Sequence, residues 1–513
     1  MARHHARHHQ WPLLLLVAVV VAVGVYELHL LRQLVKPSGL DGFDVRERAA
    51  VLALRVPDRG SSERSAVLES NAPSADTPAL RRELDDQALN ATTSVPDSTT
   101  VPPATTPVPR STAPPPVDRS RGIIIALHDG IVAMGASLIR ELRCLGNHEV
   151  IQVYHCFPDE LSAESRAMLT RGVSNVEIID VCSAMLKRDP TADMKVLQSF
   201  KSYWVKPLAV YHSSLKEIIL LDADVILLQD PAVVRSLAGY NRTGTTFFYD
   251  RVSPINKFLN RVGVRRSGTK IQLLHHLVEK FDYERFGLSG PRPSATLLNS
   301  RAYKGDTAHE QDSSMVLLDK RRSGGAMEVL RYLIFHTRFH YRFSWGDKEA
   351  FWLAYELAQQ PYFFSPWGLA LVNSVPNRDL QTHPNTMCGS MAHYLPVSHG
   401  DTALATPEVL YVNGKALLDP FPQGSVDKML KTTHRSRFFN MKPTHVTARY
   451  RRDMYPVPTA KQNLECVHEQ GTTPLPSNFR QLLLRRRFHY FAAATGLVDP
   501  LSQCLPPSPV VSS

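Results

Sequence analysis

Two aspartates, Asp222 and Asp224, directly follow the apolar run EIILL and are separated by one alanine. If the strand that this run predicts continues through them, both carboxylates point to one face, because side chains alternate along a strand. Neighbouring carboxylates repel, and burial adds to the cost of their charge. A divalent cation relieves both penalties, and an all-oxygen ligand set suits Mg²⁺ or Mn²⁺, whose open positions take phosphate oxygens. A turn in which each Asp bonds its own backbone is the alternative interpretation.

Alternating strand and helix patterns surround this pair. Apolar, β-branched runs predict strands at 121–130, 149–157, 176–181, 217–228 and, as a neighbour of the aspartate strand, 243–251. Apolar residues at helical spacing predict helices at 133–147, 159–172 and 202–215. This alternation predicts an α/β fold with a mostly parallel sheet flanked by helices. Ligands of such sheets bind beyond the carboxyl ends of the strands, so the aspartate pair lies where a ligand is expected.

The N-terminus predicts a membrane anchor. A basic, His-rich head at 1–10 precedes an apolar run, and we interpret 11–31 as a transmembrane signal-anchor. The run is slightly shorter than the ~20 residues of a spanning helix. A cleaved signal peptide is the alternative, but no small-x-small cleavage site follows the run. The arginine-bearing side is expected to stay in the cytoplasm, which gives type II topology with the rest of the chain in the lumen.

Composition then separates a stem from a folded domain. The stretch 44–121 contains no Phe, Trp or Tyr, and its second half is mostly Pro, Ser and Thr. Such a segment cannot bury enough apolar surface to fold, so 32–120 predicts an extended stem. We expect one lumenal catalytic domain at 121–500 and a short tail at 501–513.

Charge and cysteine content narrow the classes of function. The chain has 513 residues and a formal charge of +11, and the excess of Lys and Arg lies after residue 120. A basic domain suits a nucleotide pyrophosphate or an acidic glycan, although clusters such as RYRR (449–452) and LRRRF (484–488) are expected to be solvated surface. Nucleic-acid binding would contradict the membrane anchor. None of the six cysteines forms a CxxC pair, so disulfides of undetermined pairing are expected rather than a zinc module. N-glycan acceptor patterns occur at Asn90 and Asn241.

Longer segments carry a resemblance to a known family. The segments are WVKPLAVYHSSLKEIILLDADVILLQDPAVV, GYNRTGTTFFYDRV, HEQDSSMVLLDKRR, WGDKEAFWLAYELA, MCGSMAH and VLYVNGKALLDP. In this order, over roughly 121–420, they resemble the fungal Golgi α-mannosyltransferases of glycosyltransferase family 71. The resemblance implies a GT-A fold of the nucleotide-diphospho-sugar transferase superfamily, Mn²⁺ (or Mg²⁺) dependence, a GDP-mannose donor and a Golgi membrane location.

The resemblance also implies roles on the donor side. Asp222 and Asp224 match the metal-binding pair that grips the donor diphosphate. Lys206, in the matching KPLA segment, is expected to contact the nucleotide or its phosphates, with an ordinary helix-surface lysine as the alternative. His128, in the first strand-to-helix turn LHDG, is expected near the nucleotide base.

Further residues are implied beside the transferred sugar. Asp347 and Glu349 of GDKE are candidate catalytic residues, although carboxylates in a first helical turn can simply complement the helix dipole. Asp312 is a candidate for the donor sugar, in a segment where Ser313 and Ser314 replace the Ser-Gly pair of the family. His393 is a candidate third metal ligand, with the YVNGK segment as the alternative; a lone His is more often structural.

These observations predict transfer of mannose from GDP-mannose to a hydroxyl of a glycan or glycoprotein acceptor. An α-linked product (α-1,3 or α-1,2) from an α-linked donor means retention of configuration. Two alternatives stay open. One is a GT-A transferase that uses a UDP-sugar (galactosyl or glucosyl), since a diphosphate site does not report the base. The other is an inactive, membrane-anchored, lectin-like scaffold.

Overall fold

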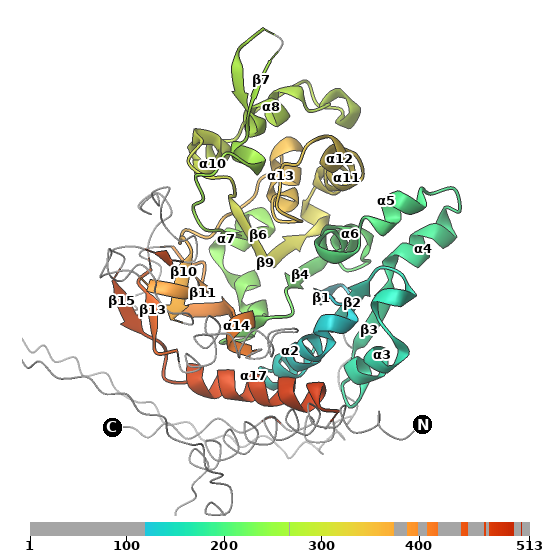
Figure 1. Ribbon diagram of the computed structural model, residues 1–513, viewed down its shortest axis with the longest axis vertical. Coiled ribbons are helices and arrows are strands. Elements are labelled where there is room, and N and C mark those ends of the chain that lie inside the picture. Colours follow the sequence, from blue (N-terminus) through green and yellow to red (C-terminus); the bar gives the residue numbers. More distant parts are fainter. Residues whose placement is uncertain are drawn as a thin grey trace, which may run out of the picture. The chain divides into compact units, whose positions relative to one another are not determined.

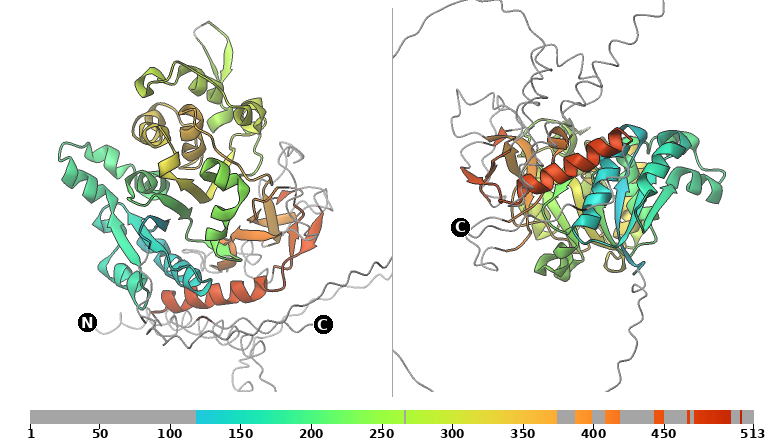
Figure 2. Two further views of the ribbon diagram at one scale, coloured as in Figure 1. Left: turned by 180° about the vertical axis from the view of Figure 1, so that it is seen from behind. Right: turned by 90° about the horizontal axis from the view of Figure 1, so that it is seen from below.

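The computed structural model describes residues 118–265, 267–373, 387–398, 408–418, 443–449, 466–467, 471–496 and 504, which form an α/β fold (Figures 1 and 2). The predicted cytoplasmic head, membrane anchor and nearly all of the stem lie outside these ranges, as does the tail apart from Cys504. Within the described ranges, none of the helices has the length and apolar character needed to cross a bilayer.

The first sheet has six strands in the order β3-β2-β1-β4-β9-β6. Its strands are β1 (Arg121–Ala126), β2 (Val150–His155), β3 (Val176–Asp180), β4 (Glu217–Leu221), β6 (Thr245–Tyr249) and β9 (Gln311–Asp319). The pairs β1–β2, β1–β4 and β2–β3 are parallel, which confirms the mostly parallel sheet that alternation predicts. β9 runs antiparallel to both β4 and β6. The expectation that 243–251 lies beside the aspartate strand is therefore wrong, because β9 lies between the two.

Helices cover both faces of this sheet. The α-helices of the described residues are α2 (Val132–Cys144), α3 (Ala163–Thr170), α4 (Val181–Arg188), α5 (Met194–Gln198), α6 (Val205–His212), α7 (Ala238–Thr243), α8 (Leu273–Lys280), α9 (Ala295–Asn299), α10 (Arg301–Lys304), α11 (Ala326–Tyr332), α12 (Arg338–His340), α13 (Ala350–Leu357), α14 (Lys415–Leu418) and α17 (Phe479–Ala494). Ile123 and Ile125 of β1 pack with α2 and α17, whereas Ile124 packs in a second cluster with α6, α11 and α13. Both faces are thus buried, as parallel sheets require.

A second, antiparallel sheet lies beside the first. Its order is β15-β13-β10-β11-β12-β5, and β14 pairs with β11. Its strands are β5 (Val225–Leu227), β10 (Ala370–Asn373), β11 (Met387–Tyr394), β12 (Val409–Asn413), β13 (His445–Thr447), β14 (Cys466–Val467) and β15 (Thr472–Pro474). A separate small hairpin joins β7 (Val262–Val264) and β8 (Lys270–Gln272). The sequence did not predict the second sheet, because its strands are short and far apart in the chain.

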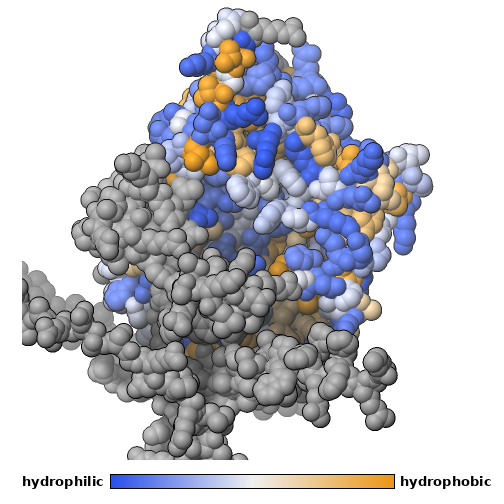
Figure 3. Space-filling model, viewed as in Figure 1, coloured by the Kyte–Doolittle hydropathy of each residue, from blue (hydrophilic) through white to orange (hydrophobic). Residues whose placement is uncertain are grey.

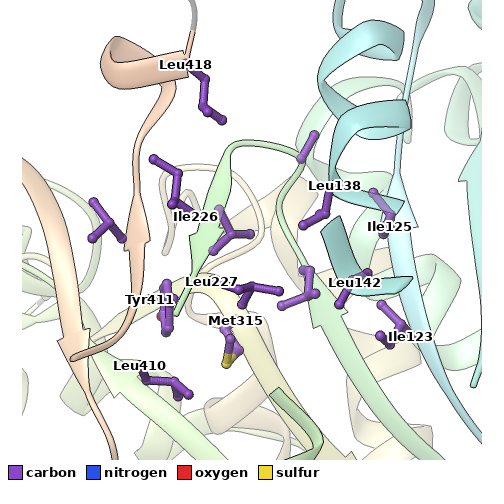
Figure 4. Close-up of a cluster of buried hydrophobic side chains, with 14 of the residues drawn as sticks. Ile123, Ile125, Leu138, Leu142, Ile226, Leu227, Met315, Leu410, Tyr411 and Leu418 are labelled. Atoms are coloured by element: carbon purple, nitrogen blue, oxygen red, sulfur yellow. The ribbon is translucent and has the colours of Figure 1, made fainter. Parts of the chain in front are cut away.

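The predicted strand 217–228 is in fact two strands. β4 belongs to the first sheet and β5 to the second, and the residues Asp222, Ala223 and Asp224 form a turn between them. The expectation of one continuous strand is wrong, because β5 pairs with β12 rather than continuing beside β1. Figure 4 shows Ile226 and Leu227 of β5 between Leu138 of α2 and Tyr411 of β12, so the core holds the turn from both sides.

Two disulfides tie peripheral segments to this core. Cys156, after β2, bonds Cys182 in α4, and Cys144, at the end of α2, bonds Cys504. The second bond attaches a residue of the predicted tail to the first helix of the domain. The lumenal location predicted for this domain is compatible with such bonds, which persist in oxidising compartments.

Candidate active site

The aspartate turn is fixed by hydrogen bonds from both sheets. The backbone N–H of Asp222 donates to the Ser314 carbonyl on β9 (2.9 Å). The N–H of Gly414, after β12, donates to the Asp224 carbonyl (3.0 Å). Ala223 is buried between them, while the two aspartates are only half-buried. The turn therefore presents two carboxylates from a rigid junction, as candidate ligand residues require.

Lys206 joins three of the predicted site residues. It lies on α6, and its Nζ is 2.8 Å from Asp222 Oδ1 and 3.0 Å from Asp347 Oδ2. It also donates to Ser313 Oγ at 3.1 Å. The Lys206 side chain is 7% exposed and that of Asp347 only 2%, so the helix-surface alternative for Lys206 is wrong. The structure thus brings Lys206, Asp222 and Asp347 into one cluster, which we call the Lys206 cluster.

In the Lys206 cluster two carboxylates share one ammonium. Burial raises the pKa of Asp222, and Asp224 and Asp347 add to the effect, so that despite Lys206 the pKa reaches about 7. Burial also raises the pKa of Asp224. Burial by itself would lower the pKa of Lys206, but attraction to Asp222 and Asp347 outweighs it and raises the pKa. The turn can therefore accommodate a further cation beside its carboxylates.

A pocket of about 260 Å³ opens onto this turn. It is lined by Ala126, Leu127, His128, Ile131, Met134, Glu160, Ser202, Tyr203, Val205, Lys206, Asp222, Ala223, Asp224 and Lys415. It lies beyond the carboxyl ends of β1 and β4, as expected for a ligand of this class of sheet. Four predicted donor-side residues (His128, Lys206, Asp222 and Asp224) meet here, and we call this cavity the donor pocket. His128 is exposed, and its Nδ1 accepts from the Gly130 N–H at 3.2 Å.

Two residues at the end of β12 and the start of α14 lie beside Asp224. Lys415 lines it, and its charge acts to lower the pKa of Asp224. The side-chain amide of Asn413, with its nitrogen toward Asp224, lies 3.3 and 3.0 Å from the two carboxylate oxygens. Both belong to the YVNGK segment, which sequence analysis named only as an alternative source of a metal ligand. Their position beside Asp224 could not be predicted, because it depends on the pairing of β5 with β12.

A second charged cluster lies next to the first and is more deeply buried. Asp312 accepts from Ser314 Oγ at 2.5 Å and lies 2.8 Å from His393 Nε2. Lys348 pairs with Asp250 at 2.5 Å. Burial alone would raise the pKa of both aspartates, but His393 outweighs it at Asp312, and Lys348 with Arg251 outweighs it at Asp250, so both pKa values are lowered. Every carboxylate in this group has a cationic or hydrogen-bonding partner.

His393 is placed on Asp312 rather than with the aspartate turn. In the described part of the chain, no group of three or more His, Cys, Asp and Glu side chains is arranged to hold a metal ion. Asp222 and Asp224 therefore have no third protein ligand of these types among the described residues. Asp312 itself is 2% exposed and does not line the donor pocket.

Glu349 is buried away from the donor pocket. Its side chain is fully buried and accepts from Trp352 Nε1 at 2.6 Å and from the backbone N–H groups of Glu310 and Gln311 at 3.2–3.4 Å. Its carboxylate fixes the start of α13 to the start of β9. Glu349 therefore lies two residues after Asp347 but does not line the donor pocket.

The arginines of α17 are buried, which corrects the expectation of a solvated LRRRF cluster. Arg486 is fully buried, and its Nη2 donates to the Ala223 carbonyl of the aspartate turn at 2.6 Å. Arg485 makes a two-pronged pair with Glu141 of α2 at 2.6 and 2.9 Å. Arg487 donates to Leu417 of α14 at 2.7 Å. Figure 2 shows α17 alongside α2, and the three arginines pack inward from this helix.

Comparison with known proteins assigns the class of this chain. The Mannosyl_trans3 family model, described as mannosyltransferase, matches residues 120–394, more than half of the 513 residues. The chain belongs to this mannosyltransferase family, as the resemblance predicts. The matched range includes the Lys206 cluster but ends before Lys415 and α17.

Two of the relatives that this chain resembles come from fungi. MNN14 of Candida albicans is 26% identical over 276 residues, covering 53% of this chain and 36% of MNN14. The alpha-1,3-mannosyltransferase MNT3 of Saccharomyces cerevisiae is 25% identical over 320 residues, covering 58% of this chain and 47% of MNT3. The chain thus spans between about a third and a half of the length of these relatives.

Among solved structures, core-mannan synthase A (CmsA/Ktr4) from Aspergillus fumigatus in its Mn/GDP form is 9% identical, with a TM-score of 0.33, covering 49% of this chain and 72% of the other. The galactosyltransferase LgtC, in complex with donor and acceptor sugar analogues, is 13% identical with a TM-score of 0.27, covering 48% and 73%.

Proposed function

We propose that this chain transfers a mannosyl residue from GDP-mannose to a hydroxyl of a glycan acceptor, with retention of configuration, on a GT-A-type fold. Membership of the mannosyltransferase family supports mannose as the transferred sugar. One structural observation supports the position of the active site. The ammonium of Lys206 bridges Asp222 and Asp347 beside a pocket at the carboxyl ends of β1 and β4. An acidic turn, two lysines and an open pocket meet there, beyond the carboxyl ends of the strands where ligands of such sheets bind.

We propose that Asp222 and Asp224 hold a divalent cation, Mn²⁺ or Mg²⁺, in this pocket. The residues fit such an ion, because their carboxylates are oxygen donors, line an open pocket and lie in an excess of negative charge. With two protein carboxylates available, the remaining positions would be taken by donor phosphates and water. When bound, the cation supplies charge neutralisation to the departing diphosphate.

The residues of the chain have separable tasks in this proposal. Lys206 and Lys415 place positive charge on two sides of the pocket, where they would bind the donor diphosphate. Asp347 orients Lys206 and lies next to the position expected for the transferred sugar. His128 would face the nucleotide base. No side chain is assigned as a nucleophile, and the leaving diphosphate would accept the proton of the acceptor hydroxyl.

We propose type II insertion of the whole protein in the Golgi membrane, with residues 11–31 as the anchor and the catalytic domain in the lumen. The basic head and the apolar run of the sequence support this. Protease treatment of sealed Golgi vesicles tests it. The catalytic domain should survive until detergent is added, whereas digestion in intact vesicles would contradict the orientation.

The donor is tested with the purified full-length protein in detergent micelles. GDP-mannose, other GDP-sugars and UDP-sugars are offered singly with a mannoside acceptor, and with Mn²⁺ or a chelator. We expect transfer from GDP-mannose alone, lost on chelation and in Asp222→Ala. Asp282→Ala, an exposed aspartate on another segment, is the matched control that keeps activity. Use of a UDP-sugar would overturn the mannosyl donor but keep the site, and no turnover of any donor by the folded protein would favour the inactive scaffold.

A further inference from the structure

A second and larger pocket has no role in the function proposed so far. Its volume is about 570 Å³, within the roughly 300–1,000 Å³ of small-molecule sites. It is lined by Tyr249, Ala295, Thr296, Asn299, Ser300, Arg301, Lys304, Asp306, Glu310, Phe364, Ser365 and Pro366. These residues come from the end of β6, from α9 and α10, from the loop before β9 and from the segment 364–366 after α13. We call it the Tyr249 pocket.

The Tyr249 pocket lies at the same edge of the first sheet as the donor pocket. β4 and β6 run in the same direction, because both are antiparallel to β9. Asp222 follows the carboxyl end of β4, and Tyr249 is the last residue of β6. On β9, Ser314 bonds Asp222 and Gln311 pairs with Tyr249. Three residues along a strand span roughly 10 Å, a distance that a short oligosaccharide bridges.

One segment contacts residues at both pockets. Asp347 binds Lys206 of the donor pocket, whereas the next residue, Lys348, binds Asp250, which follows Tyr249. Glu349 accepts from the N–H of Glu310, a lining residue of the Tyr249 pocket. The GDKE segment therefore separates a site for the donor from a site for a second ligand. A transferase needs two such neighbouring sites, because both reactants must be held together.

The chemistry of the lining suits a neutral sugar. The Tyr249 ring is stacked on Phe364 with centroids 4.6 Å apart and planes at 11°, which fixes an aromatic surface at the pocket. The charged lining residues are two basic and two acidic ones, and Arg301 lies 3.7 Å from Asp306, so the lining carries no excess of either sign. The Asn299 amide, which donates to the Ala295 carbonyl at 2.9 Å, keeps its oxygen as an acceptor. Apolar sugar faces pack on aromatic rings, and hydroxyls bond such planar polar groups.

The surrounding surface favours the same class of ligand. Figure 3 draws one face of the molecule, and its described residues there are mainly hydrophilic, with hydrophobic side chains in small separate groups. A protein partner or a lipid surface would be expected to leave a broader apolar patch. The charge pairing in the pocket argues against a strongly anionic ligand.

We propose that the Tyr249 pocket binds an uncharged mannose unit of the acceptor glycan, one or more units away from the hydroxyl that reacts. The inference rests on the proposed function, since it supplies the second substrate of that reaction. It assigns Tyr249, Asn299 and Asp306 as residues that determine the affinity for longer acceptors.

Binding is measured first, without the donor, so that the inference does not depend on turnover. Linear α-mannotriose is titrated into the full-length protein in detergent and followed by calorimetry or by saturation-transfer NMR. We expect Tyr249→Leu and Asn299→Ala to weaken binding by about tenfold, the effect of one lost contact. Tyr249→Phe, which keeps the ring, and Leu298→Ala, an exposed neighbour on α9 that does not line the pocket, should bind like the unaltered protein.

Transfer kinetics then use acceptors of increasing length. With methyl α-mannoside, mannobiose and mannotriose, Tyr249→Leu should raise KM by about tenfold for the trisaccharide and much less for the monosaccharide, with GDP release in the absence of acceptor unchanged. Equal effects on all lengths, or no loss of mannotriose binding, would overturn the inference while leaving the proposed function in place. Pocket-dependent mannotriose binding without any transfer would instead overturn the proposed function and leave the site.

Discussion

Two buried lysines anchor neighbouring ion clusters whose charge balance differs. Lys206 binds Asp222 and Asp347, and Asp224 lies nearby, so carboxylates outnumber the ammonium. Lys348 binds Asp250, which has Arg251 3.6 Å away as a second cation. Burial, with Asp224 and Asp347, raises the pKa of Asp222 to about 7 despite Lys206, whereas at Asp250 Lys348 and Arg251 outweigh burial and lower the pKa.

This difference in charge distinguishes the Lys206 cluster, a candidate binding site, from the Lys348–Asp250 pair, a candidate structural support. The Lys206 cluster opens onto the donor pocket and carries unbalanced negative charge, so an incoming cation lowers its energy. Asp250 is buried and already has Lys348 and Arg251 as cationic partners, so removing its carboxylate leaves the Lys348 ammonium without its partner. Sequence spacing does not distinguish them, since both consist of ordinary Asp and Lys residues. The four predictions that follow test this contrast, from the largest expected effect to the smallest.

Removing a carboxylate of the aspartate turn should have the largest effect. We expect Asp222→Ala and Asp224→Ala each to lower kcat for mannosyl transfer by at least about 10²–10³-fold, because charge on the departing diphosphate loses its stabilisation. Initial rates at saturating Mn²⁺ and GDP-mannose measure this. A loss below tenfold for both variants would contradict the assignment of the cation to this turn.

Replacing Asp250 by Asn should lower the stability of the fold rather than the rate of transfer. Asp250→Asn leaves the Lys348 ammonium, whose side chain is 21% exposed, without its carboxylate. We expect the free energy of unfolding to fall by about 3 kcal/mol, as for other broken buried pairs. The midpoint of denaturant unfolding in chelator measures it, with Asp222→Asn as the matched variant. If Asp222→Asn destabilised the metal-free protein as much as Asp250→Asn, the contrast between the clusters would be wrong.

The pH dependence of stability should have opposite signs at the two aspartates. Folded Asp222 holds its proton more tightly than the unfolded chain, whose Asp pKa is about 3.9. The contribution of Asp222 to the free energy of unfolding therefore falls as pH rises from about 4 to about 7. Folded Asp250 has a lowered pKa, so its contribution is present above about pH 4 and is lost on further acidification.

Melting temperatures in chelator between pH 4.5 and 8 check this sign. Asp222→Asn should gain stability relative to the unaltered protein as pH rises across that range, and Asp250→Asn should be less stable throughout it. Parallel curves for the unaltered protein and Asp222→Asn would show that Asp222 does not contribute to the pH dependence.

The smallest effect is expected from a residue behind the turn. Arg486→Lys removes at least one of the hydrogen bonds that a guanidinium makes to Ala223 and Met134. We expect about tenfold weaker apparent Mn²⁺ affinity, with kcat at saturating metal less affected, because the turn loses part of its support. Arg480→Lys, exposed on the same helix, is the control. If Arg486→Lys left the apparent Mn²⁺ affinity unchanged, Arg486 would contribute only to the stability of the fold.

Much of the first sheet could be predicted because its elements are local. β1, β2 and β3 follow apolar, β-branched runs, and α2 follows apolar residues at helical spacing, so neighbouring residues alone specify them. The second sheet could not be predicted. Its strands are short, and β5 pairs with β12, which lies far along the chain. Such pairing depends on packing that no single window of sequence contains.

The candidate site divides in the same way. The sequence by itself determined the two aspartates after an apolar run, the GDKE segment before a helix and the family to which they belong. Only the tertiary structure decided that Lys206 joins Asp222 to Asp347, that Glu349 and Asp312 are buried, and that Arg486 of α17 binds the turn from inside. The physical reason is that a carboxylate has the same local pattern whether it binds a ligand or a buried partner. Its role is fixed by which distant charges and donors the fold places within a few ångströms of it.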